Sequence, residues 1–188
     1  MMKTIIALCA LLLAAIPAGA QTSAAAKNRV AEIRKLYEDA KARIARADTM
    51  KTDGLPRNDM VVTGDYMVAG AGPCTDVTHY YFDGDFDEEA SQEIFKPYFI
   101  THSYNVAATK FYQEFLFDDK GDLVFYYEKE TGENNETRFY FGSQEQGADD
   151  EGLIHEITKG TRTIEPPFAI RYGDELLNAF NYLMNREF

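Results

Sequence analysis

The chain has 188 residues, of which 45% are hydrophobic, and its 31 acidic residues against 19 Lys and Arg give a formal net charge of -12. A surface with this charge repels phosphate backbones and anionic lipid, so we do not expect nucleic-acid binding. The length suits one domain with a sizeable hydrophobic core.

The N-terminal segment has the features of a cleavable signal peptide. Lys3 supplies a positive charge, residues 5–16 form an almost purely apolar run, and Ala18-Gly19-Ala20 is a small-x-small cleavage site. The run is shorter than the roughly 20 residues that a membrane span needs, although a retained anchor remains the alternative. We therefore expect cleavage after residue 20 and a periplasmic or secreted mature domain, residues 21–188, with no membrane span. Removing the signal leaves Cys74 as a lone thiol, so no intrachain disulfide is expected.

Residues 23–50 are predicted to form a long amphipathic helix. Thr22 or Ser23 can cap its start, and the Gly and Pro of residues 52–56 can end it. Apolar residues recur at steps of three and four, which places them on one stripe. The stripe consists of Val30, Ile33, Tyr37, Ala40 and Ile44.

From residue 60 to residue 163 the apolar pattern changes to a period of two, which is typical of strands. The clearest local signal is the turn at residues 118–122, where Gly121 can take a positive φ between two alternating segments. Short polar links between the segments favour an antiparallel meander over parallel units. The expected strands are 60–69, 76–82, 98–106, 111–117, 123–129, 137–141 and 153–163.

A second helix is expected near the C-terminus, at about residues 174–186, with Asp174 as its cap. Its apolar stripe consists of Leu176, Leu177, Phe180, Leu183 and Met184. The sequence thus predicts a single α+β domain: a curved antiparallel sheet with the N-terminal and C-terminal helices packed on one face.

The aspartates Asp83, Asp85 and Asp87 suggest a hard-cation site, because alternate carboxylates suit calcium. The remaining EF-hand pattern fails, since Glu88 stands where glycine is needed and Ile94 replaces the bidentate glutamate. We expect a solvated acidic loop leading into a short helix at 88–95, and no cofactor. A calcium-dependent adhesion or scaffold module is the alternative.

The chain shows no established catalytic motif. His79, His102 and His155 lie in expected strands without the spacing of zinc ligands, and no GxSxG elbow occurs. Acidic residues are so common that a pair at catalytic distance would arise in any fold. A hydrolase of exported polymers that uses an Asp/Glu pair therefore stays open as an alternative.

Tyrosines supply the leading functional hypothesis. Neighbours such as Tyr126 and Tyr127 point to opposite faces of a strand, so one of them leaves the main core unless the sheet is covered on both sides. Exposed tyrosines could bind a small molecule, a glycan or a protein partner, and the acidic surface would favour a cationic or neutral one. We therefore expect a non-enzymatic binding domain, although core packing would also explain these residues. The candidate residues are Tyr80, Tyr126, Tyr127 and Tyr140.

Three segments carry a resemblance to known proteins. They are the signal end Ala18-Gly19-Ala20-Gln21, the hairpin at 114–127 and the strand at 136–141. Together they resemble small secreted proteins of Bacteroides-type Gram-negative bacteria. The resemblance implies a periplasmic or exported protein and assigns no catalytic residue.

Overall fold

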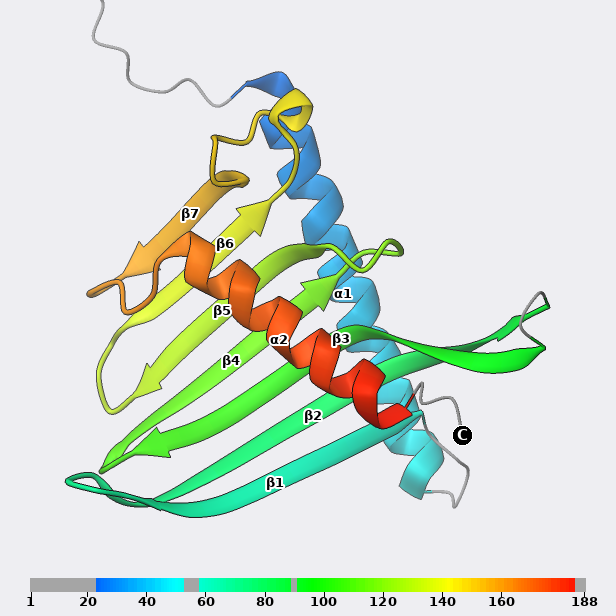
Figure 1. Ribbon diagram of the computed structural model, residues 1–188. Coiled ribbons are helices and arrows are strands. Elements are labelled where there is room, and N and C mark those ends of the chain that lie inside the picture. Colours follow the sequence, from blue (N-terminus) through cyan, green and yellow to red (C-terminus); the bar gives the residue numbers. More distant parts are fainter. Residues whose placement is uncertain (1–22, 53–57, 89–90, 185–188) are drawn as a thin grey trace, which may run out of the picture.

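The computed structural model describes residues 23–52, 58–88 and 91–184, so the expected signal peptide lies outside the described residues. Seven strands form one open sheet in which each strand pairs antiparallel with the next along the chain, and two long helices flank it (Figure 1). The expected α+β meander is confirmed. The elements are α1 (Ala24–Thr52), β1 (Asp59–Val68), β2 (Gly72–Asp87), β3 (Gln92–Val106), β4 (Thr109–Phe117), β5 (Leu123–Thr131), β6 (Glu136–Phe141), the 3-10 turn η1 (Gln144–Gln146), β7 (Leu153–Lys159) and α2 (Pro166–Met184).

Local signals explain several of these elements. Ser23 caps α1, because its Oγ accepts a 3.0 Å hydrogen bond from the amide of Ala26. Asp118 closes the β4–β5 turn by accepting 3.0 Å hydrogen bonds from the amides of Lys120 and Asp122. Gly121 adopts φ 86° in this turn, as its position predicts.

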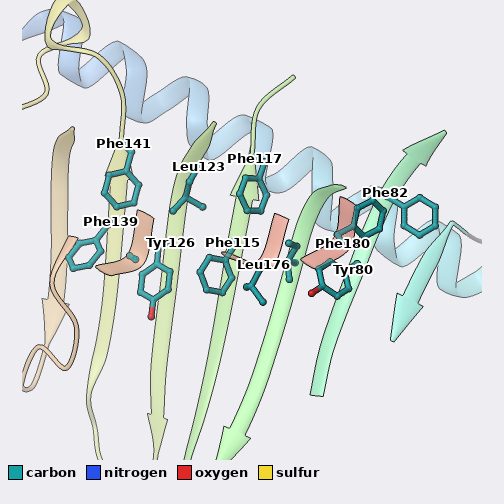
Figure 2. Close-up of a cluster of buried hydrophobic side chains, with 12 residues drawn as sticks. Tyr80, Phe82, Phe115, Phe117, Leu123, Tyr126, Phe139, Phe141, Leu176 and Phe180 are labelled. Atoms are coloured by element: carbon teal, nitrogen blue, oxygen red, sulfur yellow. The ribbon is translucent and has the colours of Figure 1, made fainter. Parts of the chain in front are cut away.

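The two helices cover opposite faces of the sheet, so the expectation that they share one face is wrong (Figure 1). Val30, Ile33 and Ala40 of α1 pack on one face, whereas Leu176 and Phe180 of α2 pack on the other. The strands carry aromatic and aliphatic side chains at successive positions, so both faces need a cover. Figure 2 shows the cluster on the α2 face, which includes Tyr80, Phe82, Phe115, Tyr126, Phe139 and Phe141.

The C-terminal helix begins at Pro166, not near residue 174. Proline suits the first helical position because its φ is already helical and its missing N–H has no role there. Asp174 is therefore an interior residue and not a cap. The preceding Gly173 is buried and lets the helix approach the sheet closely: a Cβ there would lie 3.3 Å from Leu123. The predicted apolar stripe holds for Leu176 and Phe180, but Leu183 is 49% exposed.

The acidic run forms part of a hairpin instead of a loop and a helix. Residues 83–87 belong to β2 and residues 92–95 to β3, with Asp85 opposite Ile94 in an antiparallel register. The alternating polar and apolar pattern of this run explains the outcome, because it is compatible with a strand as well as with a solvated loop. The last strand is also shorter than expected and ends at Lys159. Within the described part of the chain, no helix has the length and apolar character that crossing a bilayer requires.

Candidate functional site

A cavity of about 380 Å³ lies between α1 and the sheet, and we call it the α1 cavity. The helix contributes one wall, and β4, β5 and β6 form the floor. Its size falls near the lower end of the range of roughly 300–1,000 Å³ found for small-molecule sites. The lining residues are Arg34, Tyr37, Glu38, Glu114, Phe125, Tyr127, Arg138 and Tyr140.

Two arginines in this cavity lie over tyrosine rings. The Cζ of Arg34 is 5.6 Å from the ring centroid of Tyr140, and that of Arg138 is 5.0 Å from the ring centroid of Tyr127. Such cation–π contacts hold each guanidinium in place while leaving N–H groups available. Arg34 also donates a long hydrogen bond of 3.5 Å from Nε to the hydroxyl of Tyr140. Among the lining residues the two arginines balance Glu38 and Glu114, so the cavity carries no net charge although the protein as a whole is acidic.

Glu114 is the buried carboxylate of the cavity, with 4% of the residue exposed. Its Oε2 accepts a 2.7 Å hydrogen bond from the hydroxyl of Tyr37. Its Oε1 accepts from Tyr112 at 2.7 Å and from the ammonium of Lys41 at 3.0 Å. Three donors therefore compensate the cost of burying this charge, and the carboxylate ties α1 to the sheet.

The structure separates the four tyrosines predicted to bind a ligand. Tyr127 and Tyr140 line the α1 cavity together, although Tyr140 is only 4% exposed. Tyr80 and Tyr126 are 3% and 0% exposed and belong to the core under α2, on the opposite face (Figure 2). The expectation that all four lie on the surface is therefore wrong, because helices cover both faces. Binding by Tyr127 and Tyr140 stays a prediction.

A second polar feature crosses the α2 face. Thr78 pairs with His102, His102 with Gln113, Gln113 with Glu128 and Glu128 with Thr137, so these residues form one lateral row over five strands. We call it the polar row. All five are at most 5% exposed. Buried polar groups need hydrogen-bond partners, and the row finds them partly among its own members and partly in Tyr126, Thr163, Tyr172 and Asp76.

The hydrogen bonds of the polar row form a connected network. Gln113 Nε2 donates to Glu128 Oε2 at 2.6 Å and to the Tyr126 hydroxyl at 3.0 Å, which leaves its Oε1 as the acceptor 3.0 Å from His102 Nδ1. His102 Nε2 lies 2.9 Å from Asp76 Oδ2. Burial, followed by the charge of Glu128, raises the pKa of Tyr126 far above its ordinary value. The network fixes the strand register, because a slip by one residue would bury these groups without partners.

The predicted calcium ligands lie on β2. Asp83 is exposed and forms an ion pair with Arg43 of α1, and Asp85 accepts a hydrogen bond from the amide of Phe86. The side chain of Asp87 lies outside the described residues. Among the residues that the structure describes, no group of three or more His, Cys, Asp or Glu side chains is placed to hold a metal ion. Calcium binding stays a prediction.

The comparisons with known proteins return no match. No family model, no curated protein and no solved structure is similar to this chain at a significant level.

Sequence reasoning missed the charged residues of the α1 cavity. A signal was present in β4, where Gln113 and Glu114 interrupt a run of aromatic and aliphatic residues that extends from Phe111 to Phe117. A polar pair at such a place predicts a buried network on each face of the sheet. The position of Arg34 above Tyr140 depends on how α1 crosses the sheet, which no local pattern reports.

Proposed function

We propose that the protein is an exported, non-enzymatic binding protein that holds a small polar molecule, rich in hydrogen-bond acceptors, in the α1 cavity. The observation that supports this proposal is the pairing of Arg34 and Arg138 with the rings of Tyr140 and Tyr127 around a cavity of about 380 Å³. In a chain with a net charge of -12, a cavity in which two arginines balance Glu38 and Glu114 is a local exception.

The hydrogen-bonding capacity of the cavity favours an acceptor-rich ligand. Glu114 already receives three hydrogen bonds, so its carboxylate has little capacity left for a ligand. Arg138 has five N–H donors, of which its contact with Glu136 uses a part. Arg34 and the hydroxyl of Tyr140 add further donors. A carboxylate or a set of hydroxyl oxygens matches these groups, and the aromatic walls match the apolar face of a sugar ring.

The contacts of Glu114 also support a binding role over hydrolysis. A general acid in a glycosidase must carry a proton and face the scissile bond. Glu114 instead is 4% exposed, and its oxygens already receive hydrogen bonds from the ammonium of Lys41 and from two tyrosine hydroxyls.

Isothermal titration calorimetry with four monosaccharides tests the proposal. Galacturonate and glucuronate carry the carboxylate, and galactose and glucose are their neutral parents. We expect the acidic sugars to bind about tenfold more tightly than the neutral ones, a difference of one charge-assisted contact. The variants Arg34→Gln and Tyr140→Phe should weaken the binding of the acids.

Arg171→Gln is the matched control. Arg171 lies on α2, on the other face of the sheet, and its side chain is 65% exposed. The variant Arg171→Gln therefore removes the same charge as Arg34→Gln without changing a residue of the cavity. Absence of binding by all four sugars, or equal weakening by Arg34→Gln and Arg171→Gln, would contradict the proposal.

A further inference from the structure

A second and larger hollow lies at the end of the sheet where β2 and β3 extend beyond the other strands (Figure 1). Its volume is about 1,300 Å³, and we call it the end groove. The ladder between β3 and β4 stops at the pair Phe99 and Leu116, whereas β3 itself begins at Gln92. The groove is bounded there by the first part of β3, the β4–β5 turn and both helices.

The groove combines apolar and charged side chains. Leu36, which is 41% exposed, and Leu177 come from the two helices, and Ile94 comes from β3. An exposed leucine on α1 facing such a hollow indicates a surface that gains from being covered. An apolar lining of this size suits an elongated occupant with apolar side chains better than a single small molecule.

The charges around the groove favour a cationic occupant. Four cationic residues line it, and two of them, Arg43 and Arg29, lie near Asp83 and Asp118 in ion pairs of α1 with the sheet. The acidic residues outnumber the cationic ones and remain in excess after these pairs. They are Asp39, Asp83, Asp85, Asp118, Asp119 and Asp174.

Arg29 forms part of the wall of the groove. Its side chain is 15% exposed, and its Nε is buried without a hydrogen-bond partner among the described residues. A buried N–H without an acceptor is unfavourable, and such groups are rare in folded proteins.

We infer that the end groove binds an extended polypeptide segment of another protein that alternates apolar and basic side chains. The apolar side chains would pack on Leu36, Leu177 and Ile94, and the basic ones would face the aspartates. An extended chain entering the groove would run beside β3, where β4 ends, and continue the sheet. This inference concerns a site separate from the α1 cavity and does not depend on the ligand proposed there.

Fluorescence anisotropy with labelled ten-residue peptides tests the inference. One peptide alternates valine and lysine, and its charge-reversed partner alternates valine and glutamate. We expect the lysine peptide to bind at least about tenfold more tightly at physiological salt.

Two charge reversals on neighbouring residues of α2 supply the matched comparison. Asp174 lines the groove and Glu175 does not, while both are exposed. Asp174→Lys should lower the affinity for the lysine peptide by about tenfold. Glu175→Lys should lower it by less than about twofold, because solvent and salt screen a charge that lies outside the groove. Equal effects of the two reversals would overturn the inference. So would failure of the lysine peptide to bind, or binding of a labelled glucosamine oligomer in its place.

Discussion

The hydroxyl of Tyr37 donates a 2.7 Å hydrogen bond to Oε2 of Glu114, which joins two residues 77 positions apart. Tyr37 lies in the middle of α1 and Glu114 lies on β4. The bond is a polar anchor at the edge of the α1 cavity, beside the apolar cluster between α1 and the sheet. The position of α1 on the sheet, and with it the shape of the cavity, therefore depends on a buried charge.

The variant Tyr37→Phe tests this anchor. It removes one donor from a buried carboxylate but retains the ring, so we expect it to lower the free energy of unfolding by about 1.5–3 kcal/mol. Urea denaturation monitored by circular dichroism gives the value. Tyr66→Phe is the control, because Tyr66 is 48% exposed and its loss of a hydroxyl should be nearly neutral. Equal stabilities of the two variants would show that Lys41 and Tyr112 suffice for Glu114.

The polar row predicts a larger effect for Gln113→Leu. Leucine has a similar volume but cannot donate to Glu128 or Tyr126 or pair with His102, so three buried polar groups lose a partner. We expect a loss of roughly 2–5 kcal/mol in the free energy of unfolding. Thermal and urea unfolding should show the loss, whereas Gln144→Leu at an exposed position should change little. A stable Gln113→Leu protein would mean that the row does not hold the register.

Sequence reasoning was sufficient for the elements that depend on local pattern. The stripe of α1 from Val30 to Ile44 and the turn around Gly121 are where the spacing predicts them, because each depends on neighbours along the chain. The acidic run at 83–87 forms the end of β2 and not the expected loop, because its alternation of residue types is compatible with both.

Longer-range relationships could not be predicted in this way. The polar row joins Thr78, His102, Gln113, Glu128 and Thr137, whose separations along the chain are irregular and follow only from the register of five strands. The assignment of one helix to each face is also a tertiary outcome. Strands with apolar side chains on both faces indicate that both faces of the sheet are covered, but this pattern does not predict which helix covers which face.

Alkaline pH should destabilise the protein through its partly buried tyrosines. Burial, followed by the negative charges of Glu128 and Asp76, raises the pKa of Tyr104 to about 12. Burial, followed by the hydrogen bond to Glu136, raises the pKa of Tyr127 to about 12. The unfolded chain loses these protons near pH 10, so the stabilisation is complete below pH 10 and is lost as the pH rises towards 12.

Urea unfolding at pH 8, 10 and 11 measures this dependence, and absorbance at 295 nm reports tyrosinate. The double variant Tyr104→Phe, Tyr127→Phe should show a shallower decline above pH 10 than the unmodified protein. Lysines and other tyrosines titrate in both proteins, so the difference between the two curves isolates this pair. Parallel curves would show that neither hydroxyl holds its proton more tightly in the folded state.

The start of α1 depends on a glycine distant in sequence. Gly147 follows η1 with φ 89°, and a Cβ at this position would lie 2.7 Å from Oγ of Ser23, the atom that caps α1, and 3.0 Å from Cβ of Ala26. Gly147→Ala should therefore combine the cost of a left-handed backbone, about 1–2 kcal/mol, with loss of the cap, about 1 kcal/mol. Gly70→Ala isolates the first of these costs, because Gly70 has φ 85° and no atom within 4 Å of its Cβ position. Urea denaturation should show that Gly147→Ala is the less stable variant, and equal losses would mean that Ser23 moves aside without affecting the helix.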